Sequence, residues 1–320
     1  MSYDVITRKR ASALVFGGAA LLSMNSGAGA QATTLRVAIV PTDVSAEVYY
    51  AKDIGLFAKA GIDANIAPMG TSPAIAAALA SNAIDIGHIT VDVLAAIHQK
   101  NIPLVAIAPA SEYASPPEKM RTAALVLPAS SPVHQAKELN GKIIAVVALN
   151  GLVHTASRAW IDQNGGDSST VKFVEIPFPA MPAALEAGHV DAAFTVEPFL
   201  SAARKSGRVL VYGYDAISKH FILDAWCTTP QWANDHSDLV NRFAAVIHET
   251  AVWANKNPAK SGSILATYTR IDPAIIATMP RTHYAEQLTV ALMQPLIDVS
   301  AKYNGFSTFS AQQLLYTPSR

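Results

Sequence analysis

Two stretches of the sequence have the same order of parts, and they decide the fold. The first is LASNAIDIGHITVDVL, residues 79–94, and the second is LEAGHVDAAFTVEPFL, residues 185–200. In each, an apolar segment leads through a turn with an Asp into a short apolar strand, which ends in an acid at a helix start. Both stretches predict a helix–strand–helix passage, and we interpret Asp85 and Asp191 as turn residues that fix the helix-to-strand connection.

The first thirty residues predict a secretory signal peptide, residues 1–30, that is separate from the fold. A basic run at residues 8–10 precedes an apolar stretch over residues 11–24, and small residues follow at Ala28 and Ala30. This stretch is too short and too rich in Gly to span a membrane. We therefore expect an exported protein that diffuses freely in the periplasm after cleavage.

Composition bounds the class of protein. Hydrophobic residues make up 51% of the 320 positions, so the chain can bury a large core, and we expect two domains. Lys+Arg and Asp+Glu are equal at 24 each, which gives no reason to expect a nucleic acid as partner. The single Cys227 cannot form an internal disulfide, so burial must stabilise the fold.

From Thr34 the chain alternates short Val/Ile-rich runs with longer Ala/Leu-rich runs, which predicts an α/β fold with a mostly parallel sheet. The segment SAEVYYAKDIGLFAKAG, residues 45–61, predicts one helix that stops at Gly61. A polar, Pro-bearing stretch at residues 111–121 marks a change of domain. We predict lobe 1 from residues 33–121 and 219–320, and lobe 2 from residues 122–218, with a cleft and a hinge between them.

Ligands in open α/β sheets collect at the carboxyl ends of the strands. The loops expected there are rich in hydroxyls, Pro and Gly and contain no Lys or Arg: Pro41–Ser45, Gly70–Ala74, Thr90–Val93, Asn150–Ser157, Pro179–Ala183 and Val196–Phe199. Hydroxyls and unpaired N–H groups at helix starts can hold an anion without a cationic side chain. The alternative is that these residues only cap helices, and the sequence leaves both interpretations open.

Several motifs together carry a resemblance that covers nearly the whole chain after residue 32. They are DIGLFAKAGI from Asp53, KELNGKIIAV from Lys137, WANDHSDLVNRFAAVIHE from Trp232 and the two opening stretches. This succession resembles the periplasmic substrate-binding proteins of ABC importers, in the nitrate, sulfonate, taurine and thiamine-pyrimidine (NMT1-like) branch. The resemblance implies a two-lobe clamshell of the second binding-protein type, without catalysis or cofactor. It also implies a monomer that delivers a small-molecule ligand to a permease in the inner membrane.

By matching position, the resemblance implies that the ligand contacts come from the strand-end loops. The residues are Thr42, Asp43, Thr71, Ser72, Thr90, Asp92, Gly151, His154, Thr155, Met181, Glu197 and Asp224. Asp224 lies in LDAW, which resembles the LDxW of taurine-type binders, and the alternative is a hinge carboxylate bonded to backbone. Because four of these residues are acids, we expect a solute with a nitrogen donor, either an amino-sulfonate such as taurine or a pyrimidine.

Two other functions stay open. A pyrimidine-precursor synthase shares this fold, but its Cys-rich, His-bearing pattern is not matched by Cys227 alone. A ligand-sensing module for a membrane receptor would have the same sequence features as a transport protein. The nine His residues lack the spacing of a metal site, and no catalytic motif is present, so we expect neither metal nor turnover.

Overall fold

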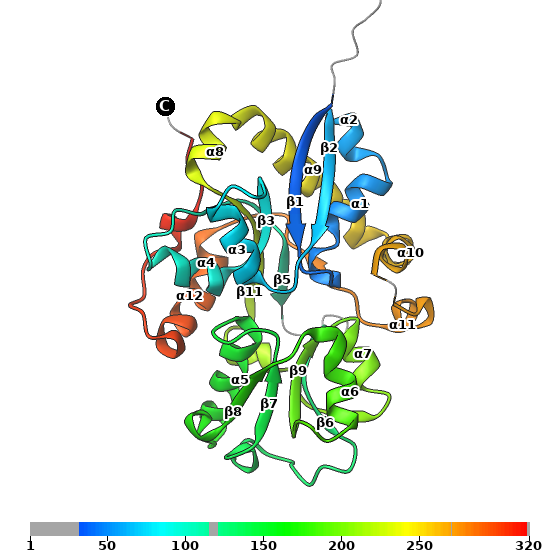
Figure 1. Cartoon of the computed structure of the whole chain (residues 1–320), viewed down its shortest axis with the longest axis vertical. Helices are drawn as coiled ribbons and strands as arrows, with labels where there is room; N and C mark the ends of the chain where they lie inside the picture. The colour runs from blue at the N-terminus through cyan, green and yellow to red at the C-terminus, as the bar shows by residue number, and fades with distance from the viewer. Residues whose placement is uncertain (1–31, 115–120, 270, 319–320) are drawn as a thin grey trace, which may run out of the picture. The chain divides into compact units, whose positions relative to one another are not determined.

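A computed structural model describes residues 32–114, 121–269 and 271–318. The predicted signal peptide and residues 115–120 of the predicted change of domain lie outside these ranges. None of the described helices is both long and apolar enough to cross a bilayer. Figure 1 shows two lobes, each built around its own sheet.

The described strands form two five-stranded sheets and one three-stranded sheet. The first sheet has the order β2-β1-β3-β12-β4, the second β10-β6-β9-β7-β8 and the third β11-β5-β13. The strands are β1 Thr33–Ile39, β2 Ile62–Pro68, β3 Ile86–Thr90, β4 Val105–Pro109, β5 Ser111–Ala114, β6 Ala123–Pro128, β7 Ile143–Val146, β8 Lys172–Glu175, β9 Ala192–Val196, β10 Gly207–Val211, β11 His220–Ile222, β12 Asp224–Thr228 and β13 His283–Tyr284.

Helices connect and cover these strands. The α-helices are α1 Glu47–Asp53, α2 Leu56–Lys59, α3 Ser72–Ala80, α4 Val91–His98, α5 Leu152–Gln163, α6 Met181–Glu186, α7 Phe199–Ala203, α8 Pro230–Asp235, α9 Ser237–Lys256, α10 Pro258–Thr269, α11 Pro273–Thr278 and α12 Val290–Asn304. Two short 3₁₀ helices, η1 Asp43–Ser45 and η6 Gly213–Ala216, follow β1 and β10.

The prediction of a mostly parallel sheet is only partly right, because both five-stranded sheets are mixed and β6 pairs antiparallel with β9 and β10. β1 pairs in parallel with β2 and β3, and β7 pairs in parallel with β8 and β9. β12 is inserted antiparallel between β3 and β4 after the chain returns from the second sheet. The chain leaves along β5 and comes back along β11, and these two strands pair side by side.

The two Asp residues of the opening stretches have the same role in both sheets. The backbone N–H of Asp85 donates to the carbonyl of Arg36, while its carboxylate accepts from the N–H of Arg36 at 2.7 Å. Asp191 makes the same reciprocal pair with Ile143, whose N–H donates to the carboxylate at 2.8 Å. Each Asp thus fixes the entrance of one strand to its parallel neighbour, which confirms the turn interpretation.

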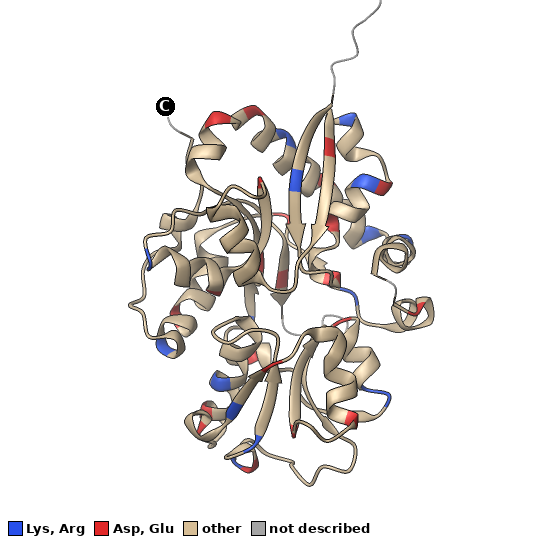
Figure 2. Cartoon of the chain, viewed as in Figure 1, with Lys and Arg blue, Asp and Glu red and all other residues tan. Residues whose placement is uncertain are grey.

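The core of the first lobe is built around Trp226, which is fully buried in β12. Its ring lies edge-on to Phe243 of α9 at 5.6 Å between centroids, and its Nε1 donates to Glu47 of α1 at 2.9 Å. Helix α9 buries Leu239, Phe243, Val246 and Ile247 in this core. The positions of Lys, Arg, Asp and Glu are dispersed along the ribbon of both lobes (Figure 2).

Two helix boundaries differ from the prediction. The single helix expected over residues 45–61 is broken into α1 and α2 at Gly55, whose φ of 80° leaves the helical region. Gly61 has the positive φ of 67° expected after a helix. Helix α5 begins at Leu152, ahead of the predicted start near Thr155.

Gly87 of β3 gives a test of the packing between this strand and α3. A Cβ added there would lie 2.4 Å from Ile75 Cγ2 and 3.1 Å from Leu79 Cδ1, whereas one added at Gly70 meets nothing within 4 Å. We expect Gly87→Ala to lower the free energy of unfolding by ~1–3 kcal/mol through overpacking, and Gly70→Ala to leave it nearly unchanged. Urea denaturation of both variants measures the difference, and equal midpoints would contradict this packing.

Candidate functional site

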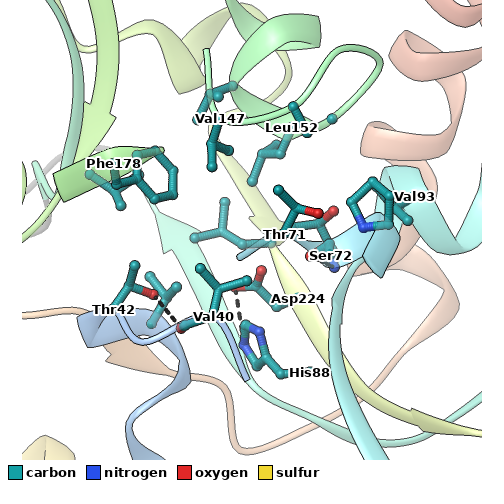
Figure 3. Close-up of a pocket in the computed structure, with 18 of the residues that line it drawn as sticks. Val40, Thr42, Thr71, Ser72, His88, Val93, Val147, Leu152, Phe178 and Asp224 are labelled. Atoms are coloured by element: carbon teal, nitrogen blue, oxygen red, sulfur yellow. Dashed lines mark hydrogen bonds and ion pairs between the residues drawn. The ribbon is translucent and has the colours of Figure 1, made fainter. Parts of the chain in front are cut away.

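A pocket lies where the carboxyl ends of strands from both five-stranded sheets meet (Figure 3). It encloses about 610 Å³ of empty space, part of which is open to solvent. The first lobe lines it with Val40, Thr42, Val44, Thr71, Ser72, Pro73, His88, Thr90, Val93, Leu223 and Asp224. Lining residues of the second lobe are Val147, Ala148, Gly151, Leu152, Val153, Phe178, Val196 and Tyr214. Strand-end loops therefore build the site, as sequence reasoning expected.

Three helix starts face this pocket, and they differ in how they are capped. Thr71 caps α3, because its hydroxyl accepts from the N–H of Ala74 at 3.3 Å. Thr90 before α4 and Gly151 before α5 make no side-chain cap. The first N–H groups of a helix have no partner within it, so the α5 start at Leu152 and Val153 offers donors at the pocket wall.

Half of the residues predicted to contact ligand line this pocket. They are Thr42, Thr71, Ser72, Thr90, Gly151 and Asp224. The other six do not line it, although all are buried: Asp43, Asp92, His154, Thr155, Met181 and Glu197. Whether any of the twelve binds a ligand stays a prediction.

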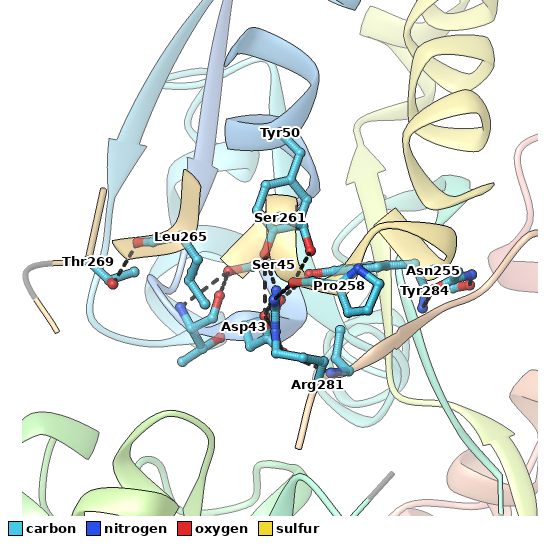
Figure 4. Close-up of polar contacts among 12 residues, drawn as sticks. Asp43, Ser45, Tyr50, Asn255, Pro258, Ser261, Leu265, Thr269, Arg281 and Tyr284 are labelled. Atoms are coloured by element: carbon cyan, nitrogen blue, oxygen red, sulfur yellow. Dashed lines mark hydrogen bonds and ion pairs between the residues drawn. The ribbon is translucent and has the colours of Figure 1, made fainter. Parts of the chain in front are cut away.

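Asp43 is the centre of a buried polar cluster (Figure 4). Its carboxylate accepts two bonds from Nε of Arg281 at 3.1 Å and one from Nη2 at 2.7 Å. The N–H of Thr282 donates to Oδ2 at 2.7 Å, and the hydroxyl of Tyr50 donates to Oδ1 at 3.3 Å. Tyr284 donates to the backbone carbonyl of Asp43. The negative charge of Asp43 is thus compensated by Arg281.

Glu197, the acid of the opening Glu-Pro, is bonded to the start of α7. Its two carboxylate oxygens accept from the N–H and the hydroxyl of Ser201, at 3.0 and 2.9 Å. Burial raises the pKa of Glu197 to about 7. Its backbone carbonyl accepts from the N–H of Asp43 at 3.4 Å, which joins the strand-end loops of the two lobes.

Three other predicted residues of the second lobe, His154, Thr155 and Met181, are buried outside the pocket lining. Nδ1 of His154 accepts from the N–H of Asn150 at 2.8 Å, and burial lowers the pKa of His154 to about 4. Thr155 is fully buried and accepts from Asn304 at 3.5 Å. Met181 is fully buried in the core of its lobe. These contacts support the wall that Leu152 and Phe178 present to the pocket.

Asp224 forms the polar floor together with Ser111 and His88. The hydroxyl of Ser111 donates to Oδ2 of Asp224, so this carboxylate is bonded to a side chain and not to backbone as the alternative interpretation expected. Nε2 of His88 lies 3.7 Å from the same oxygen. Burial lowers the pKa of His88 to about 3, so the imidazole is neutral and this contact is no ion pair.

Sequence reasoning missed His88, the aromatic walls and the apolar lining. His88 precedes Thr90 by two positions on β3, so strand periodicity places both side chains on one face. This periodicity could have identified His88 from the predicted Thr90. Phe178 comes just ahead of the predicted Met181. Tyr214 reaches the pocket from η6, and no motif marks it.

None of the described residues that line the pocket is Lys or Arg. Burial raises the pKa of Asp224 to about 8 and that of Asp92, beneath the floor, to about 7. Among the described residues, no group of three His, Cys, Asp or Glu side chains is placed to hold a metal ion. The site is therefore an apolar cavity with a few polar groups at one end, which suits a small organic molecule.

The cluster around Asp43 makes a prediction for Arg281, whose side chain is 14% exposed beside a fully buried partner. Arg281→Met leaves the Asp43 carboxylate buried without its cation, so we expect a loss of ~3–5 kcal/mol in the free energy of unfolding. The control is Lys219→Met, which removes an exposed pair with Asp215 and should cost about 0–1 kcal/mol. Urea denaturation compares the two, and similar losses would show that Arg281 does not compensate a buried charge.

Comparison with known proteins places this geometry in a family. The family model described as NMT1/THI5 like matches residues 43–261. The chain is 28% identical over 221 residues to the taurine-binding periplasmic protein of Escherichia coli (strain K12). That match spans 67% of this chain and 64% of the relative, slightly under two thirds of its length.

Solved structures show the same fold. The periplasmic aliphatic sulphonate binding protein of Escherichia coli aligns with a TM-score of 0.71 at 19% identity, over 90% of this chain and 93% of that one. The periplasmic nitrate-binding protein of Synechocystis PCC 6803 aligns with a TM-score of 0.69 at 14% identity, over 91% and 93%. The fold is the two-lobe clamshell of periplasmic binding proteins, and the chain belongs to the NMT1/THI5-like family.

Proposed function

We propose that this protein is the solute-binding component of an ABC importer and that it works in the periplasm after removal of residues 1–30. The observation that carries the proposal is the pocket between the strand ends of the two lobes, because a solute there contacts both lobes at once. The taurine-binding relative and the sulphonate- and nitrate-binding neighbours support it. A permease in the inner membrane would be the partner, and the protein would act as a monomer.

The solute that fits this pocket is small and organic: taurine, an alkanesulfonate or a nitrogen heterocycle. Of the four acids that suggested a nitrogen donor, only Asp224 lines the pocket. Arg281 compensates the charge of Asp43, and Ser201 donates two hydrogen bonds to the carboxylate of Glu197. An amine or ring N–H would reach the Asp224 end. An acidic end would reach the N–H groups at the start of α5, where the helix dipole favours negative charge.

The two alternative functions, a synthase and a ligand-sensing module, can each be distinguished from transport. A synthase that used Cys227 would need a reactive thiolate, but Cys227 is fully buried and burial raises the pKa of its thiol. We therefore favour binding without turnover. A sensing module would bind solute in the same pocket, so the neighbouring genes distinguish it: a permease and an ATPase indicate import, and a histidine kinase indicates sensing.

We propose the predicted lobe limits, residues 33–121 with 219–320 and residues 122–218, as the bodies that move in closure. The paired strands β5 and β11 carry the chain between them. Contacts to both lobes exist only in the closed state, so a solute shifts the population toward it. We expect small-angle X-ray scattering to show a smaller radius of gyration at saturating taurine. An unchanged radius with taurine bound would exclude closure about this hinge.

A panel of solutes tests the ligand assignment by thermal shift. It includes taurine, propanesulfonate without an amine, nitrate and an aminopyrimidine. At about a hundredfold excess over its Kd, a true solute stabilises the folded protein by ~2.7 kcal/mol. We expect taurine or the aminopyrimidine to give the largest shift and Asp224→Asn to reduce it.

Two further variants serve this panel. Asp238→Asn, on the exposed face of α9, is the control that should leave every shift unchanged. Glu197→Gln tests the ligand role predicted for Glu197, which a reduced shift would support. An equal shift with propanesulfonate and taurine, unaffected by Asp224→Asn, would refute the pairing of Asp224 with a nitrogen donor.

A further inference from the structure

Asp224 lies in the floor of the pocket, and a second buried carboxyl group, that of Asp92, lies outside the pocket lining. In the β3–β12 ladder Asp224 is paired directly with Thr90, and the next bond runs from the N–H of Val91 to the carbonyl of Leu223 at 3.0 Å. Helix α4 begins at Val91, so Asp92 lies in its first turn beside Asp224. Their charges interact, since Asp92 contributes to the raised pKa of Asp224.

Asp92 has no compensation of the kind that Asp43 receives. It is fully buried, and neither carboxylate oxygen has a hydrogen-bond partner of good geometry among the described residues. The Thr90 hydroxyl and the Val93 N–H lower the pKa of Asp92, but burial has the larger effect and raises it. Asp224 has Ser111 as its donor and no cation. A buried carboxylate without a partner is costly, so such a group keeps its proton or gains a positive charge from elsewhere.

Among the described residues, the groups that face this pair supply no positive charge. From β3 comes His88, whose Nε2 is also buried without a hydrogen-bond partner and whose ring is neutral. From η6 comes Tyr214, whose raised pKa reflects burial and then the charges of Asp224 and Asp92. Behind the floor lie Cys227 of β12 and Glu47 of α1, both fully buried and both with pKa values raised by burial. Apart from Tyr214, the second lobe lines the pocket without a titratable side chain.

We propose that Asp92 and Asp224 form a proton-holding carboxyl pair, through which the pocket selects a solute with a protonated nitrogen and releases a proton when that solute binds. This rests on the proposed function and adds the charge class of the solute and the pH dependence of its capture. The proton leaves Asp224 for solvent, and the solute keeps its own proton and forms a charge-assisted hydrogen bond to the carboxylate. Asp92 acts through Asp224 as a positioning residue, because it does not line the pocket.

The Kd of the solute depends on pH because Asp224 holds a proton in the free protein and has lost it in the complex. The pKa values of about 7 for Asp92 and about 8 for Asp224 lie above those of free carboxyl groups. Below both values the solute must displace a proton, so its Kd falls as the pH rises. We expect the Kd to fall by about tenfold per pH unit between about pH 6 and 8 and to level off above.

The first experiment needs no solute. Infrared difference spectra of the free protein between about pH 6 and 9 report the carbonyl stretch of protonated carboxylic acids. The pKa of Glu197 is also raised to about 7, so the spectra are recorded in the Glu197→Gln background, which removes its contribution. In that background we expect a band that titrates near neutral pH, is reduced by Asp224→Asn, and titrates at lower pH in Asp92→Asn. Asp238→Asn, which removes an exposed acid, should leave it unchanged. Absence of a band near neutral pH, or a band that Asp224→Asn and Asp92→Asn both leave intact, overturns the proposal whether or not the protein serves an importer.

The second experiment measures the released proton. Calorimetric titration with taurine and with propylamine, each in two buffers of different ionisation enthalpy, gives the protons lost per bound amine. We expect about one near pH 7, with little release in Asp224→Asn and a smaller release in Asp92→Asn. Binding of either amine without proton release overturns the proposal. Binding of propanesulfonate but of neither amine also overturns it, and leaves the importer function standing.

Discussion

The ion pair between Asp43 and Arg281 is the interaction on which the site depends. It ties the loop after β1, which lines the pocket with Thr42 and Val44, to a segment that lies 238 positions away in the sequence. Tyr50 and Thr282 also donate to the buried Asp43 carboxylate, and Tyr284 donates to the backbone carbonyl of Asp43. The N–H of the same Asp43 reaches the carbonyl of Glu197 in the other lobe. One compensated carboxylate therefore fixes one pocket wall and joins it to the facing strand end.

A second constraint repeats in both sheets and sets where the strands point. Asp85 and Asp191 lock the entrances of β3 and β9 to their parallel neighbours through reciprocal backbone and carboxylate bonds. With the entrances fixed, the carboxyl ends converge on the pocket, where helix starts expose N–H groups and short side chains. The acids at the entrances thus serve the fold, and only acids at the opposite ends of the strands are placed to serve a ligand.

Local patterns predicted the fold well, because strand and helix periods depend on near neighbours. The paired stretches at residues 79–94 and 185–200 gave the sheet entrances, and the strand-end loops gave six residues of the pocket. The helix break at Gly55 was missed, since a glycine with positive φ is not distinguishable from one within a helix by spacing. Arg281 and Tyr214 were also missed, because their contacts join segments that nothing local relates.

The same limit explains why the acids could not be sorted from the sequence. Asp43, Asp92 and Glu197 follow strands at helix starts and Asp224 begins β12, yet the four meet different tertiary partners. Arg281 compensates Asp43, Ser201 binds Glu197, and Ser111 binds Asp224, while Asp92 has no hydrogen-bond partner of good geometry among the described residues. Burial is similar for all four, so the partner decides whether the carboxylate is a structural anion or a group that responds to a ligand. Because none of the described lining residues is Lys or Arg, the carboxyl group of Asp224 in the floor, coupled to Asp92 outside the lining, sets the charge that an incoming solute meets.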